Sequence, residues 1–140
     1  MSEAFVWQAR VYWEDTDAGG VVYHSNYLRF MERARTEWLR ARGISQRQLA
    51  SDPGVAFSVV ALEIQYHRSA RLDDLLSVSC EPRRIGGASI SFAQRIWREG
   101  QEVEPLVSAQ VRIACLDAAS MRPQRLPQLI ERLISAQSAD

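Results

Sequence analysis

The sequence has few of the residues and segments that mark specialised proteins. Only two cysteines, Cys80 and Cys115, occur among its 140 residues, and they lie far apart without forming a C-x-x-C pair. Neither a disulfide framework nor a zinc site is therefore indicated. Both cysteines lie in apolar, alternating segments, which favours two buried, reduced thiols. No apolar run approaches about eighteen residues, and the N-terminus has no basic segment followed by an apolar core, so we expect an unexported, cytoplasmic protein without membrane insertion.

An excess of charge of either sign is also absent. The 17 basic residues balance the 17 acidic ones. The long-range field that draws proteins onto nucleic acid or anionic lipid is then missing, so no nucleic-acid partner is expected and any phosphate binding must be local. With 46% hydrophobic and 24% charged residues, the chain has the composition of one globular domain, covering residues 1–140.

Two hydrophobic periodicities are present in the first part of the chain. Residues 6–13 alternate between apolar and polar side chains and predict a half-buried strand. Residues 26–42 carry an apolar stripe with helical spacing and predict one long amphipathic helix, with Ser25 at the N-cap and Gly43 at the C′ position. The expected apolar faces are Trp7, Ala9, Val11 and Trp13 in the strand, and Tyr27, Met31, Ala34, Trp38 and Ala41 in the helix.

The remaining chain alternates again and predicts a sheet. Four further strands are expected, at residues 62–67, 76–81, 90–96 and 107–115. Turn-forming residues between them predict hairpin connections, at Asp73-Asp74, Gly86-Gly87 and Gly100. Residues 45–50 are expected to add a helical turn, and residues 126–136 a short terminal helix. One helix packed against an antiparallel sheet of about five strands is an α+β fold without a βαβ repeat.

The segment EDTDAGGVVYHSNY, residues 14–27, holds the most promising chemistry. It places carboxylates, two glycines and a histidine where a loop meets a helix. A helix N-terminus offers unpaired N–H donors and a positive dipole end, which can polarise a carbonyl or stabilise an oxyanion. A carboxylate beside such donors can attack a substrate or activate water.

Composition alone also allows a purely structural reading of these residues. An aspartate before a helix is usually a turn or capping residue, and paired glycines usually form a turn. Glu14 and Asp15 are favoured as solvated or structural residues because no further ligands at useful spacing suggest a metal. His24 could serve only as a hydrogen-bond donor near the helix start, and His67 is favoured as a surface residue at a strand end.

The stretch VYWEDTDAGGVVYHSNYLRFMERARTEWLR, residues 11–40, resembles the signature of the 4-hydroxybenzoyl-CoA thioesterase family. Within that family it is similar to the Tol-Pal-associated acyl-CoA thioesterases of bacteria. The segments YHRSARLDDLLSV and SFAQRIW also fit this subgroup, so the resemblance runs over nearly the whole chain. It implies a hotdog fold, in which a sheet wraps the long helix and two subunits join their sheets, with sites at the dimer interface.

The resemblance also implies roles for individual residues. Asp17 falls on the family's catalytic carboxylate, and His24 falls where a backbone N–H faces the thioester carbonyl. In the founding thioesterases an arginine pair close before a Ser-Phe strand meets the nucleotide phosphates, whereas here GGAS separates the arginines from that strand. Candidate phosphate ligands, each of which could equally be a surface arginine, are Arg68, Arg71, Arg83 and Arg84. The further candidate substrate contacts are Gly19, Val22, Tyr23, Tyr27 and Ser91.

The implied function is hydrolysis of acyl-CoA or acyl-carrier-protein thioesters to free acid and thiol. Asp17 would act as nucleophile or general base, and His24 would assist orientation or proton transfer. Coenzyme A enters only as part of the substrate, and no metal or other cofactor is expected. The alternatives are a hotdog dehydratase of hydroxyacyl thioesters and a non-catalytic module that binds acyl thioesters or a protein. The resemblance further implies a homodimer or homotetramer.

Overall fold

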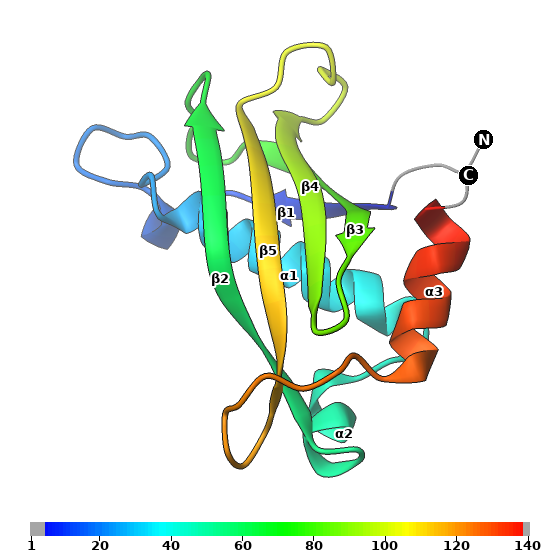
Figure 1. The fold of residues 1–140 in the computed structure, drawn as a ribbon. Coiled ribbons are helices and arrows are strands. Elements are labelled where there is room, and N and C mark those ends of the chain that lie inside the picture. The colour runs from blue at the N-terminus through cyan, green and yellow to red at the C-terminus, as the bar shows by residue number, and fades with distance from the viewer. Residues whose placement is uncertain (1–4, 139–140) are drawn as a thin grey trace.

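The computed structural model of the chain describes residues 5–138, except for the side chains of Arg84, Ile85 and residues 135–138. Figure 1 shows the long helix α1 crossing behind the strands of a curved sheet. The elements in chain order are β1 (Phe5–Arg10), the 3-10 helix η1 (Trp13–Asp15), α1 (Asn26–Arg40), α2 (Gln46–Ser51), β2 (Val55–Tyr66), β3 (Leu75–Ile85), β4 (Ser89–Arg98), β5 (Val107–Asp117) and α3 (Gln128–Ser138).

The sheet has five antiparallel strands in the order β1-β3-β4-β5-β2. The strands β3, β4 and β5 form a central meander, and β1 and β2 lie at opposite edges. β1 pairs with β3 from Phe5 opposite Cys80, and β2 pairs with β5 from Val55 opposite Asp117. The α+β class and the five-stranded antiparallel sheet with one long helix are therefore confirmed.

The prediction that hairpins link all four later strands is wrong at one connection. β4 and β5 lie between β2 and β3 in the sheet, so residues 67–74 form a crossover instead of a hairpin. As an edge strand, β2 keeps part of its apolar surface in contact with solvent. Four of its side chains are at least 40% exposed, namely Val59, Val60, Leu62 and Tyr66. Alternation predicted the strand, but it cannot indicate which strand is its neighbour.

Helix α1 buries most of the predicted stripe. Tyr27, Met31, Ala34 and Trp38 are at most 2% exposed, and the Trp38 ring meets the Phe92 ring of β4 edge-on, with 5.4 Å between centroids. The helix ends at Arg40 instead of Arg42, so Ala41 is exposed. Gly43 has a φ of +79°, and the Ile44 N–H donates to the Leu39 carbonyl, as expected of a glycine-terminated helix. Ser25 occupies the N-cap, but its helical backbone angles prevent the expected side-chain cap.

The first strand is shorter than the alternation predicts. β1 ends at Arg10, and the chain then turns through η1, where the Asp15 N–H donates to the Tyr12 carbonyl at 3.0 Å. Trp13 begins this turn and is 83% exposed, so its predicted place on the buried face is wrong. Local hydrogen bonds around Asp15 override the alternating pattern here.

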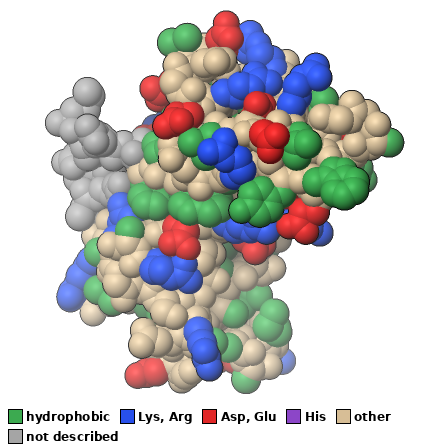
Figure 2. Space-filling model, turned by 180° about the vertical axis from the view of Figure 1, so that it is seen from behind, with side chains coloured by type: hydrophobic (Ala, Val, Ile, Leu, Met, Phe, Trp, Pro, Cys, Tyr) green, Lys and Arg blue, Asp and Glu red, His purple; other side chains and the backbone are tan. Residues whose placement is uncertain are grey.

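Both cysteines are buried and free, as predicted. None of the helices in the described part of the chain is long and apolar enough to span a membrane. Figure 2 shows basic and acidic side chains interspersed on the face opposite to the view of Figure 1. This mixture agrees with the balanced charge of the sequence.

Candidate active site

Asp15 anchors the loop that precedes α1. The residue is 8% exposed, and its carboxylate accepts hydrogen bonds of 2.8 Å from the Asn26 side-chain amide and from the Tyr12 backbone N–H. Its carbonyl accepts a further bond from the Tyr23 N–H at 2.9 Å. These bonds fix both ends of the loop, so Asp15 is structural, as the sequence favoured.

Asp17 lies at a tight turn within the same loop. Its N–H donates to the Val21 carbonyl at 2.9 Å, and its carbonyl accepts from the Gly20 N–H at 3.0 Å. Gly20 has a φ of +80°, a conformation that glycine adopts without strain. The Gly19 N–H donates to Oδ1 of Asp17 at 2.8 Å, and this orients the exposed carboxylate. A Cβ at Gly19 would lie 3.2 Å from the same oxygen, so a larger residue there would require this carboxylate to shift.

A cavity of about 270 Å³ opens beside the Asp17 carboxylate. Three parts of the chain form it: the loop before α1, the first turn of α1, and the end of β2 with the residues after it. The structure thereby brings together five of the predicted site residues, Asp17, Val22, His24, Tyr27 and Arg68. The prediction omitted four other lining residues, Val21, Tyr66, His67 and Ser69.

Two tyrosines connect the walls of this cavity. The Tyr27 hydroxyl accepts a hydrogen bond from the Ala70 N–H, and the Tyr66 hydroxyl donates to the His24 carbonyl, each at 2.9 Å. The two rings lie 5.8 Å apart between centroids. Burial raises the pKa of both hydroxyls above the usual value of 10.0, so each stays a neutral phenol at physiological pH.

The start of the crossover after β2 also contributes two nitrogen-bearing side chains to the cavity wall. His67 shares a hydrogen bond of 2.6 Å between its Nε2 and the Ser108 Oγ, and Arg68 donates from Nη1 to the Pro105 carbonyl at 3.2 Å. His67 directly follows β2 and is exposed, as predicted, but it also lines the cavity. The alternating pattern of the sequence could not predict that His67 lines the cavity, because only the crossover after β2 brings this residue beside the loop before α1.

The N-terminus of α1 has unpaired backbone donors, and one of them belongs to His24, which lines the cavity. Within the described residues, the backbone N–H groups of His24 and Ser25 donate to no protein acceptor. The missing Ser25 side-chain cap leaves this helix end open. Unpaired amides at a helix N-terminus attract an anion or a polarised carbonyl oxygen. The arrangement can therefore stabilise negative charge beside the Asp17 carboxylate.

The other predicted site residues lie elsewhere in the chain. Tyr23 is exposed, and its ring packs 4.4 Å from the His24 ring. Arg71 forms an isolated β-bridge with Val21, one of the residues that line the cavity. Arg83 pairs with Glu81 at 3.3 Å, and Ser91 lines a separate depression with Arg112. The Arg84 side chain lies outside the described residues. Within a single chain, neither Arg83 nor Ser91 therefore lines the cavity beside Asp17.

The described side chains do not form a metal site. They contain no cluster of three or more His, Cys, Asp and Glu residues that could hold a metal ion. The polar side chains that line the cavity are instead the Asp17 carboxylate, two imidazoles, two neutral phenols, one guanidinium and the Ser69 hydroxyl. These are groups that hydrogen-bond, transfer protons or attack a carbonyl.

This chain is similar in sequence and fold to thioesterases. A model of the family described as the thioesterase superfamily matches residues 19–104. The acyl-CoA thioesterase YbgC of Haemophilus influenzae is 44% identical over 131 residues, which cover 94% of this chain and 94% of the relative. The acyl-CoA thioester hydrolase YbgC of Escherichia coli O6:H1 is 46% identical over 126 residues, covering 90% and 92%. The crystal structure of a probable thioesterase from Bartonella henselae has a TM-score of 0.83 and 40% identity, covering 89% of this chain and 100% of that one.

The likeness to these thioesterases extends over most of the chain. The family match includes the Gly19-Gly20 turn, α1 and three of the strands. The relatives match this chain almost from end to end, so the likeness is not confined to the loop before α1. The hotdog fold and the enzyme class are thereby confirmed. The chain belongs to the thioesterase superfamily.

Proposed function

We propose that the protein hydrolyses acyl-CoA thioesters to a free acid and a thiol, with Asp17 as its reactive carboxylate. The observation that carries this proposal is the cavity that places Asp17 beside the open N-terminus of α1. Two relatives with more than 40% identity are named acyl-CoA thioesterase or acyl-CoA thioester hydrolase, which supports the same substrate class.

The geometry supports a polarised carbonyl next to a carboxylate. The thioester oxygen accepts hydrogen bonds from the unpaired N–H groups of His24 and Ser25, which stabilise the negative charge of the tetrahedral intermediate. As a nucleophile, Asp17 forms an acyl anhydride and expels the thiolate, and water then cleaves the anhydride to return the carboxylate. As a general base, Asp17 instead takes a proton from the water that attacks the carbonyl. Both routes use the same carboxylate oxygens.

The remaining cavity side chains suit binding and proton transfer. The His24 imidazole and the neutral Tyr27 and Tyr66 phenols can position the thioester or return a proton to the leaving thiolate. The Arg68 guanidinium can meet a phosphate oxygen of coenzyme A. Arg83, Arg84 and Ser91 stay candidate contacts for a substrate that extends beyond one chain.

Several finer features belong to the same proposal. The apolar, exposed edge strand β2 supports a homodimer or homotetramer, because an unpaired apolar edge is a template for association. The resemblance supports membership of the Tol-Pal-associated subgroup of the 4-hydroxybenzoyl-CoA thioesterase family, and it supports a cytoplasmic enzyme. Acyl carrier protein is the alternative carrier of the acyl group. No metal or resident cofactor takes part in either route.

Thiol release from a panel of acyl-CoA esters tests the function directly. The wild type should release coenzyme A from at least one short, long or aromatic acyl-CoA. Asp17→Asn keeps the shape and the bond from the Gly19 N–H but cannot act as nucleophile or base, so its kcat should fall by roughly three orders of magnitude or more. Asp52→Asn changes another exposed aspartate and should keep the wild-type kcat. A folded Asp17→Asn variant with most of its kcat, or a wild type that releases no thiol, would contradict the proposal.

A further inference from the structure

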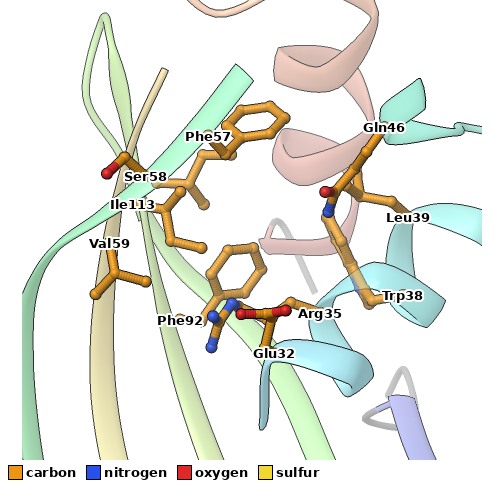
Figure 3. Close-up of a pocket in the computed structure, with 11 residues that line it drawn as sticks. Glu32, Arg35, Trp38, Leu39, Gln46, Phe57, Ser58, Val59, Phe92 and Ile113 are labelled. Carbon is orange, nitrogen blue, oxygen red and sulfur yellow. The ribbon is translucent and has the colours of Figure 1, made fainter. Parts of the chain in front are cut away.

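A second cavity, of about 380 Å³, lies between α1, α2 and the sheet. It shares none of its lining residues with the cavity beside Asp17. Figure 3 shows apolar side chains in its walls, with Phe57, Phe92 and Ile113 on the sheet side and Trp38 and Leu39 on α1. Polar side chains line the rest of it, namely Glu32, Arg35, Gln46 and Ser58. An apolar cavity of about 150 Å³ holds a benzene molecule, so the apolar part of this larger cavity has room for a body of roughly ten carbons.

One charged side chain is buried in the wall of this cavity. Arg35 is 9% exposed, and Figure 3 shows it extending from α1 toward the sheet side of the cavity. Its Nη1 donates to the Gln94 Oε1 at 2.9 Å. The Gln94 amide is itself held by a bond to the Met31 carbonyl at 3.0 Å. The guanidinium is therefore held by a neutral amide and has no hydrogen-bonded anion among the described residues.

A buried ionised group normally has an anionic partner. Among the described residues, no carboxylate lies within ion-pair distance of Arg35. Glu32 also lines the cavity, but it is exposed and acts on Arg35 only through space. A guanidinium has five N–H donors in a fork that fits a carboxylate, and Gln94 accepts only one hydrogen bond from it.

We propose that this cavity binds a small organic carboxylate with an apolar body. Its carboxylate pairs with Arg35, and its apolar part lies against Phe57, Phe92 and Ile113. Glu32, at the exposed side, repels the bound anion and weakens the complex. Binding involves no turnover, so this inference stands or falls separately from the proposed thioesterase activity.

Titration calorimetry with two matched probes tests the site. The probes are 4-phenylbutyrate and 4-phenylbutyramide, which share their apolar body and differ in charge. We expect 4-phenylbutyrate to bind the wild-type protein with a Kd on the order of 1 mM, as usual for a ligand of this size. The amide should bind roughly tenfold more weakly, because it lacks the charge-assisted hydrogen bonds to Arg35.

Three variants on α1 identify the residue responsible. Arg35→Met should weaken 4-phenylbutyrate binding by roughly tenfold and leave amide binding within about twofold of wild type. Arg33→Met removes the same charge from an exposed position of the helix and should leave both affinities unchanged. Glu32→Gln should strengthen carboxylate binding by about twofold or more, because it removes the nearby negative charge.

Some results would overturn the proposal. Equal affinity for the two probes would make the cavity a purely apolar pocket, and undetectable binding of 4-phenylbutyrate at about ten times the expected Kd would leave no carboxylate site. If Arg35→Met fails to fold by circular dichroism, the two probes on wild type and on Glu32→Gln still decide the question. An affinity for 4-phenylbutyrate that is unchanged or weaker in Glu32→Gln would also refute the assigned geometry.

Discussion

The hydroxyl oxygen of Tyr27, in the first turn of α1, accepts a hydrogen bond of 2.9 Å from the backbone N–H of Ala70. Both residues are buried, at 2% and 0% exposure. The bond connects the helix that follows the Asp17 loop to the crossover that carries His67 and Arg68. It therefore holds together the two chain segments that form the cavity.

Replacing Tyr27 with phenylalanine should destabilise the protein and loosen the cavity. The variant leaves the buried Ala70 N–H without an acceptor, and such a group costs about 1–3 kcal/mol. Urea unfolding followed by circular dichroism measures the loss. Tyr23→Phe is the matched control, since the exposed Tyr23 hydroxyl has no hydrogen bond with any described residue, and its stability should equal that of wild type. Equal stability of Tyr27→Phe and Tyr23→Phe would show that the bond contributes nothing.

Of the two aspartates in the DTD segment, Asp15 should contribute to stability and Asp17 to activity. Asp15→Ala removes the acceptor of the Asn26 amide and the Tyr12 N–H, so it should lower the free energy of unfolding by about 2–4 kcal/mol. Asp17→Ala removes an exposed carboxylate and should change that free energy by less than about 1 kcal/mol while it abolishes thiol release. The free energy of unfolding and the rate of thiol release, each measured for both variants, test this difference. A stable Asp15→Ala variant would reverse the structural assignment.

The helix and the sheet could be predicted because each has its own hydrophobic period. The four-three spacing from Tyr27 to Trp38 is buried along α1 as expected. Strand neighbours could not be predicted, because alternation at Leu62 and Ile64 indicates a strand with two faces and says nothing about its place in the sheet. Trp13 was misplaced because side-chain bonds to Asp15, which no periodicity records, turn the chain.

In the candidate site, likewise, some residues could be predicted from the sequence and others could not. Asp17, His24 and Tyr27 are close in sequence, so a local motif was enough to place them together. Tyr66 and His67 enter the cavity only because the crossover after β2 returns to the loop before α1. That crossover depends on the strand order, which the sequence pattern did not reveal. The likeness to a family supplied the role of Asp17, and spacing alone would not have done so.

His24 offers a test of proton transfer through the pH dependence of activity. The imidazole is the side chain that usually titrates near neutrality, and His24 lines the cavity with Asp17. If the imidazole transfers a proton, His24→Ala should lower kcat by roughly 10²-fold or more and remove one limb of the pH profile. His67→Ala is the matched control for a cavity imidazole. Unchanged kcat and pH profile in His24→Ala would limit the role of the residue to its backbone N–H.

The edge strand β2 offers a test of assembly. We expect sedimentation velocity to show an oligomer for the wild type, because Val59, Val60 and Leu62 expose apolar surface on an unpaired edge. Leu62→Lys places a charge on this surface and should shift the protein toward a monomer. Val103→Lys changes a turn residue that is 93% exposed and should leave the assembly unaltered. A monodisperse, active wild-type monomer would contradict the expectation.

Cys80 predicts how stability changes at alkaline pH. Burial raises the pKa of its thiol from 9.0 to about 12, so between these values the folded protein keeps a proton that the unfolded chain loses. The stability that the protonated Cys80 thiol contributes is therefore fully present below pH 9. It should be lost as the pH rises toward 12, and the free energy of unfolding should then fall by at most about 1.4 kcal/mol per pH unit. Urea midpoints measured from pH 8 to 11 should fall less steeply in Cys80→Ala. Parallel slopes in the two proteins would exclude this contribution.

The strand order also governs when the protein can fold during its synthesis. Val55 at the start of β2 pairs with Asp117 at the end of β5, so β2 has no partner in the sheet until the ribosome has made most of the chain. β1 likewise waits for β3. The loop with Asp17 and the helix α1 are translated early, but the strands that bury them follow later. The nascent chain must therefore carry its apolar α1 stripe uncovered until the central meander emerges, and this favours folding late in translation or after release.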